Sequence, residues 1–245
     1  MPIAPADLKF FNSTNMVEDD TSTVGGAIAT TGRPEFTQLT ANAVAAVVSD
    51  GADTRTVTVT GRLAAGTIAS EALVLNGVTE VVGATTFERF LKAVIGAADA
   101  SRTVTVKQGS GGATRMTIVP NETTRRLLFY ASASEAGIVI RYEKYFGKNT
   151  HATLTLTSSQ IKLTADPDAR VRIGAAPAVD DTATATNRKT APASVTFVDD
   201  NVAQSVPGGN LAAGSAIGIW AEENLPASDT AHRTTFTTEL SGNTV

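Results

Sequence analysis

Two histidines are the only side chains of this 245-residue chain whose ordinary pKa lies near neutrality, so they are the first candidates for acid–base chemistry. His151 follows Thr150 at the start of an expected strand, and His232 lies close to the C-terminus. No acidic residue stands near His151 in the sequence to orient it as a general base. We therefore predict no enzyme activity and no catalytic residues, while a site assembled from distant parts of the chain stays an open alternative.

Two further stretches contain residue types that bind ions. Glu18, Asp19 and Asp20 supply oxygen ligands suited to Ca²⁺, but they lack the alternating spacing and the glycine of a compact calcium loop. The run Gly109-Ser-Gly-Gly112 follows Lys107, whereas a phosphate-binding loop ends in Lys followed by Ser or Thr. We therefore predict that the acidic stretch is a solvated loop and that the glycine-rich stretch is a hairpin loop. The chain also has no cysteine for a thiolate site, so we predict no metal and no cofactor.

The single tryptophan, Trp220, lies in an alternating run in which Ile217, Ile219 and Ala221 share one face and Trp220 takes the other. An exposed tryptophan would suit a sugar platform or an interface anchor, whereas a structural one would lie under a loop or at a subunit contact. We favour the structural role. Because only three tyrosines accompany this tryptophan, a glycan-binding adhesin is an alternative and not the first choice.

The stretch from Arg141 to Leu163 is expected to form the centre of the fold. Its aromatic-rich first part ends at the turn-forming Gly147-Lys-Asn149, and Ala152 to Thr157 then alternates apolar residues with threonine. In such a strand Leu154 and Leu156 face a core while the threonines face water. We interpret the stretch as a central antiparallel hairpin.

Similar alternation recurs along the chain and indicates its structural class. The pentapeptide RTVTV begins at Arg55 and again at Arg102. The segment from Thr85 to Ile95 fits either a strand or a capped helix, and the resemblance described below favours the strand. Only 5% of the residues are aromatic, which suits short strands and tight turns. The predicted fold is all-β, with two β-sandwich domains of Ig-like or jelly-roll-like type.

Two linker-like stretches divide the chain. Gly32-Arg-Pro34 and Ser132 to Gly137 have the composition of linkers, so residues 35–131 are predicted to be a β domain inserted into another domain. Residues 1–34 would then supply an N-terminal arm and the first strand of the outer sandwich. Residues 132–245 would supply the remaining strands of that C-terminal sandwich.

Four segments of the outer region carry specific expectations. Met1 to Thr23 has two prolines, three clustered acidic residues and few apolar side chains, so we expect a neighbouring subunit to order it. Ala175 to Pro192 is predicted to be a long, mobile polar loop. Val195 to Val198 is predicted to begin a strand, and Thr234 to Leu240 is predicted to close the sheet.

Charge and hydropathy restrict the partners. The net charge of −4 gives no basic face for nucleic acid, so we expect no direct DNA or RNA binding. The longest apolar run, Ala43 to Val48, is far shorter than the roughly 18 residues that span a membrane. The N-terminus MPIAPADLKFF lacks the basic start and apolar core of a secretion signal. We expect neither a membrane location nor export.

The terminal regions resemble a group of tailed-phage virion proteins. These proteins carry a strand similar to KNTHATLTL at Lys148–Leu156 and one similar to NLAAGSAIGIW at Asn210–Trp220, and they begin with strands similar to ADLKFF at Ala6–Phe11 and VGGAI at Val24–Ile28. The middle of the chain resembles a second recurrent phage module, with TVTVTG, ALVLNGVTEV, FERF and TVTV in that order.

The resemblance implies a structural component of a tailed-phage virion, made in the host cytoplasm and located in the particle. The first expectation is a capsid decoration protein that self-associates, as a trimer or a ring, and packs on the major capsid protein. A tail or neck protein that contacts other tail proteins is the alternative. The resemblance brings no catalytic, cofactor-binding or metal-binding residues.

Overall fold

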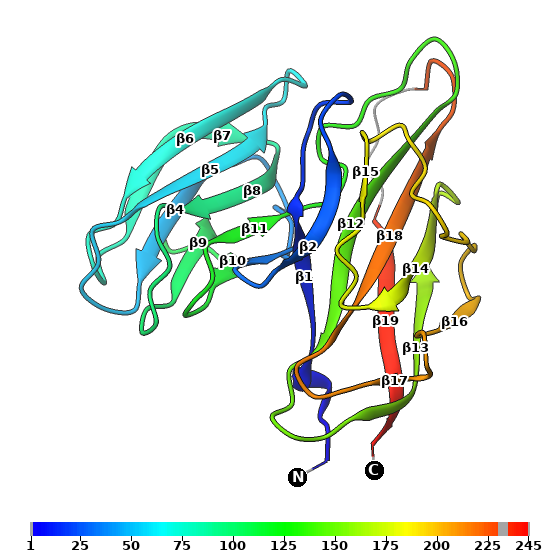
Figure 1. Ribbon diagram of the computed structural model, residues 1–245. Helices are drawn as coiled ribbons and strands as arrows, with labels where there is room; N and C mark the ends of the chain where they lie inside the picture. Colours follow the sequence, from blue (N-terminus) through cyan, green and yellow to red (C-terminus); the bar gives the residue numbers. More distant parts are fainter. Residues whose placement is uncertain (1, 230–234, 245) are drawn as a thin grey trace. The chain divides into compact units, whose positions relative to one another are not determined.

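The computed structural model describes residues 2–229 and 235–244 of the chain, which are drawn in colour in Figure 1. The fold is all-β, as predicted, and the described elements are strands apart from one 3₁₀ turn at Pro5–Asp7. Two compact units are present: the outer unit, Met1–Ala29 with Phe129–Val245, and the middle unit, Thr30–Leu128. The sequence placed the corresponding boundaries at residues 35 and 131.

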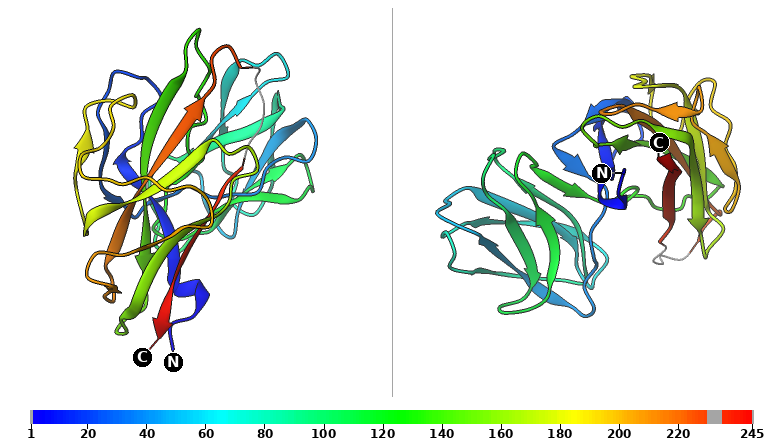
Figure 2. Two further views of the ribbon diagram at one scale, coloured as in Figure 1. Left: turned by 90° about the vertical axis from the view of Figure 1, so that its right-hand side faces the viewer. Right: turned by 90° about the horizontal axis from the view of Figure 1, so that it is seen from below.

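The outer unit is a sandwich of two sheets (Figures 1 and 2). One sheet has six strands in the order β14-β18-β12-β1-β2-β15, with bounds Val171–Val179, Ala216–Leu225, Val139–Asn149, Leu8–Asn15, Val24–Ala29 and Thr184–Ala185. In the other sheet, β13 pairs with three strands, and the bounds of β13, β16, β17 and β19 are Leu156–Ala165, Ala203–Ser205, Asn210–Leu211 and Thr237–Thr244.

Strands β12 and β18 form the middle of the six-stranded sheet and are covered on both faces. They pair from Val139 opposite Leu225 to Lys148 opposite Ala216, and directly opposed residues share a face. One face meets the second sheet, where the Tyr145 hydroxyl lies 2.6 Å from the Thr238 hydroxyl. Because the other face is covered by β2, β15 and the segment after β15, the residues of β18 from Ala216 to Glu223 are all buried.

The predicted central hairpin is wrong, because β12 and β13 lie in different sheets. The Asn149 side chain donates to the carbonyl groups of Leu154 and Leu211, which fixes the chain where it leaves one sheet for the other. Strand β13 begins only at Leu156, which is buried as predicted, whereas Leu154 precedes the strand and is half-buried. Alternation defines the face of each residue but not the partner strand, so it could not distinguish these pairings.

Three further expectations for the outer unit need correction. Met1 to Thr23 was expected to be ordered by a neighbouring subunit, but its residues Leu8–Asn15 form β1, which lies between β12 and β2 of the same chain. The expected loop Ala175 to Pro192 includes the end of β14 and all of β15. Val195 to Val198 forms no strand and contributes one isolated bridge, from Val198 to Ile173. Thr234 lies outside the described residues, and the expected closing strand is present as β19, Thr237–Thr244.

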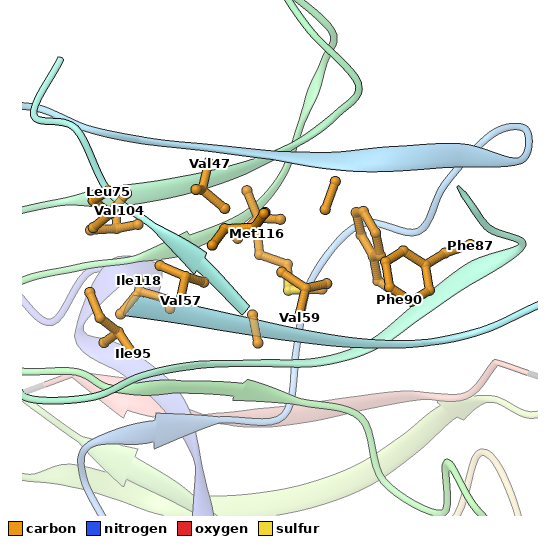
Figure 3. Close-up of a cluster of buried hydrophobic side chains, with 14 of the residues drawn as sticks. Val47, Val57, Val59, Leu75, Phe87, Phe90, Ile95, Val104, Met116 and Ile118 are labelled. Carbon is orange, nitrogen blue, oxygen red and sulfur yellow. The ribbon is translucent and has the colours of Figure 1, made fainter. Parts of the chain in front are cut away.

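The middle unit is a second two-sheet sandwich. Its four-stranded sheet has the order β10-β9-β4-β7, with bounds Thr114–Ile118, Val104–Gln108, Ala43–Ser49 and Val81–Phe87. Its five-stranded sheet has the order β3-β11-β8-β5-β6, with bounds Gly32–Arg33, Thr124–Arg126, Arg89–Ile95, Thr56–Arg62 and Ile68–Val74. Valines of β5 and the phenylalanines of β7 and β8 meet between the two sheets (Figure 3).

For the middle unit, too, some sequence expectations are confirmed and others need correction. Thr85 to Ile95 is strand, as favoured, and forms the end of β7 and all of β8. The two RTVTV pentapeptides supply β5 and β9, which belong to different sheets and so are not equivalent strands. The expected linker Gly32-Arg-Pro34 contains β3, which pairs in parallel with β11.

Candidate functional site

Six buried charged side chains of the outer unit lie on or against β12 and β18, and we call them the buried charge cluster. Its members are Arg141, Glu143, Lys144, Arg188, Glu222 and Glu223. The register places Arg141 opposite Glu223, so both lie on the face toward the second sheet, together with Glu143. Lys144 and Glu222 lie on the other face. Charged groups are buried at a cost unless they are paired, so the partners of each decide what the cluster does.

Arg188 and Glu143 form an ion pair that is fully buried on both sides. A guanidinium nitrogen of Arg188 lies 3.0 Å from Glu143 Oε1, and both side chains are 0% exposed. Arg188 also donates to the Glu18 carbonyl group at 3.0 Å and to the Ser132 hydroxyl at 3.1 Å. The backbone N–H of Phe129 donates to the second oxygen of Glu143 at 3.0 Å. The pair therefore ties three segments that are distant in sequence to strand β12.

Arg141 binds Asp20, one of the three acidic residues that the sequence offered as possible calcium ligands. Two of its nitrogens each lie 2.8 Å from one oxygen of Asp20, a bidentate geometry, and a third donates to the Ala133 carbonyl group at 2.7 Å. The Thr21 hydroxyl and the backbone N–H groups of Thr21 and Ser22 donate to Asp19, which lowers the pKa of its carboxyl. The acidic loop is thus paired with the protein itself, and the described residues contain no group of carboxylates and histidines arranged for a metal.

Glu223 is the member of the cluster whose carboxyl pKa is shifted toward neutrality. Burial raises the pKa of its carboxyl from 4.5 to about 7, a hydrogen bond from Ser132 opposes this, and the Glu143 carboxylate raises it further. The positive charges of Arg188 and Arg141 lower it. Its Oε2 has no hydrogen-bond partner among the described residues. Near neutral pH the group therefore changes between a neutral and a charged form inside the protein.

Lys144 occupies a separate buried position on the opposite face of the sheet. Its ammonium nitrogen lies 2.7 Å from Asp181 Oδ2 and donates to the carbonyl groups of Gly26, Asp181 and Ala183 at 3.0 to 3.1 Å. The nitrogen lies 5.0 Å from the ring centre of Phe146 and 5.6 Å from that of Trp220. Burial lowers the pKa of the Lys144 ammonium, and the Asp181 carboxylate opposes that shift.

The residues singled out in the sequence do not come together in a site. His151 Nδ1 accepts the backbone N–H groups of Thr153 and Leu154, so its ring closes the turn before β13. His232 lies outside the described residues. Trp220 is 1% exposed and packs on Val24, Tyr142 and Ala185, so it belongs to the core and is not a sugar platform.

The glycine-rich loop binds a carboxylate of the protein itself. Gly111 N–H donates to Glu80 Oε1 at 2.7 Å, and Lys107 lies 2.8 Å from the other oxygen of Glu80. The loop joins β9 to β10 as a hairpin loop, as predicted. An anion site at this position is therefore already filled by Glu80.

Sequence reasoning missed the buried charge cluster. A signal was present, because RYEKYF and IWAEEN place charged residues inside strands that are otherwise apolar. Arg188 had no comparable signal, since it lies in a polar segment and becomes buried only through tertiary contacts.

Comparison with known proteins adds no relative. No protein-family model, no curated protein and no solved structure matches this chain.

Proposed function

We propose that this chain is a non-enzymatic structural component of a tailed-phage virion, and specifically a capsid decoration protein. It would act by associating with copies of itself and packing on the major capsid protein. One observation carries the proposal: segments from both ends of the chain that resemble phage virion proteins contribute strands to one sheet. The motif ADLKFF enters β1, VGGAI forms most of β2, and AIGIW lies in β18, within the order β18-β12-β1-β2.

The arrangement supports the proposal because chance similarity of short strands would not favour neighbours in space. Residues of β1 and β12 pair from Leu8 opposite Asn149 to Asn12 opposite Tyr145. The motif KNTHATLTL then begins at the end of β12 and reaches the start of β13. The resembling residues thus describe one structural unit, while the residues between them form the middle unit.

The burial of the aromatic residues favours a structural protein over a glycan-binding module. A sugar platform would need Trp220 exposed beside a tyrosine. Trp220 is buried, and so are Tyr130, Tyr142 and Tyr145, which are all the tryptophan and tyrosine residues of the chain. A tail or neck protein remains the alternative within the virion.

Gold labelling of purified particles tests the proposal. An antibody against this chain should label the capsid shell at many positions. Label confined to the tail or neck would refute decoration and support the alternative. Particles that lack the chain by mass spectrometry would refute a virion component altogether. The oligomeric state of the purified chain provides a second test, since a trimer supports decoration whereas a ring of about six or twelve copies supports the tail or neck.

A further inference from the structure

Lys144 and Asp181 bring an amine and a carboxyl group into direct contact inside the outer unit. The Lys144 side chain is 0% exposed, the Asp181 side chain is 14% exposed, and their nitrogen and oxygen lie 2.7 Å apart. The rings of Phe146 and Trp220 flank the nitrogen and keep water from it. Burial favours the neutral amine of Lys144, which is a nucleophile, and the carboxyl carbon of Asp181 is the electrophile beside it.

A second lysine pair shows what burial changes. Lys107 and Glu80 of the middle unit lie 2.8 Å apart, but their side chains are 26% and 19% exposed. Water therefore reaches both side chains of that pair, whereas the Lys144 side chain is fully buried. The two pairs have nearly the same separation, so the chain contains its own control for the effect of the surroundings.

We propose that Lys144 and Asp181 become joined by an intramolecular amide bond after the protein has folded. A proton first moves from Nζ to the carboxylate along their hydrogen bond, and Nζ then attacks Cγ of Asp181. The C–N bond forms, one C–O bond of the carboxyl group breaks, and a second proton from Nζ leaves with that oxygen as water. One ammonium and one carboxylate thus give one amide and one water, with no oxidant, cofactor or change in net charge.

Backbone groups around the pair are placed to assist this step. The carbonyl groups of Gly26 and Ala183 each accept a hydrogen bond from Nζ at 3.1 Å, which fixes the direction of the nitrogen. The N–H of Ala183 donates to Asp181 Oδ2 at 3.2 Å, so it polarises the carboxyl group and stabilises negative charge that develops on it. The fold holds the two reacting groups together, which replaces a bimolecular encounter by a unimolecular one.

The bond would attach the segment that covers Trp220 to the middle of the sheet. Lys144 lies in β12, and Asp181 lies in the connection between β14 and β15. The product is uncharged, so burial no longer opposes it as it opposes an ion pair. The inference does not depend on the proposed virion role, because it rests only on these contacts.

Mass spectrometry of the purified full chain tests the proposal. The denatured protein should be lighter than its linear sequence by one water molecule. Trypsin should leave Lys144 uncut and yield a branched species that joins residues 142–148 to residues 173–188. Asp181→Ala and Lys144→Met should each restore the full linear mass, and the peptides that contain Lys107 should be unmodified.

The wild-type protein alone decides the matter if either variant fails to fold. An intact mass equal to that of the linear sequence, with cleavage after Lys144, would overturn the proposal. A loss of water that maps to Lys107 and Glu80, or to any other pair, would overturn it as well, since burial of Lys144 would then not be the cause.

Discussion

Replacing Glu223 by glutamine tests the electrostatics of the buried charge cluster. Glu223 is 7% exposed, and burial is the main reason that the pKa of its carboxyl lies near 7. The hydroxyl of Ser132 and the charges of Glu143, Arg188 and Arg141 are the other groups that act on it. Glutamine keeps nearly the same shape and cannot ionise, so the variant isolates the effect of the charge.

The sign and size of the effect follow from proton linkage. The pKa of Glu223 is higher in the folded protein, about 7, than its ordinary value of 4.5, so folding takes up a proton in this interval. The stabilisation from this proton uptake is fully present below the ordinary pKa of 4.5 and is lost as the pH rises through the folded-state pKa of about 7. At about 1.36 kcal/mol per pH unit, the wild type loses about 3 kcal/mol of unfolding free energy from this group. Glu223→Gln should not lose it.

Urea unfolding of both proteins at about pH 5 and about pH 8 measures this difference, because the m-value and midpoint give the unfolding free energy at each pH. From about pH 5 to about pH 8, the unfolding free energy of the wild type should fall by about 2–3 kcal/mol more than that of the variant. Glu239→Gln, at an exposed position on β19, serves as a control and should show little change. A difference between Glu223→Gln and the wild type that is the same at both pH values would refute the reasoning.

Three other predictions concern the core and the domain organisation. Gly25 has φ +95°, and a Cβ at this position would lie 2.6 Å from the Trp220 ring. Gly25→Ala should therefore lower the unfolding free energy by about 1–3 kcal/mol in urea titrations, and an unchanged midpoint would contradict this packing. Arg188→Met removes the buried cation that pairs with Glu143 and should cost about 3–5 kcal/mol in the same assay, and adding Glu143→Gln should recover part of the loss. Residues 30–128 expressed alone should unfold cooperatively on heating, because their core lies between their own two sheets; a broad transition without a baseline would show that this unit needs the rest of the chain.

The structural class was available from the sequence because alternation is a local property. Arg55 to Thr60 reads as a strand from its own residues, since every second side chain lies on the same face whatever the strand pairs with. The same reasoning placed Leu156 in a core. It also identified the loop at Gly109 to Gly112, because turn residues act through their own backbone preferences. Thr85 to Ile95 was different, because its own pattern fitted a strand or a capped helix and only the resemblance favoured the strand that the structure shows.

The pairing of strands and the burial of charge were decided only by the tertiary structure. β12 and β13 follow each other in the chain yet lie in different sheets. β1 lies inside a sheet of its own chain, although the composition of its segment suggested order supplied by a neighbouring subunit. Glu143 and Arg188 are both buried because the fold brings two distant segments together, so each satisfies the other. Local sequence specifies which face a side chain takes, whereas its partner depends on long-range contacts that no local pattern records.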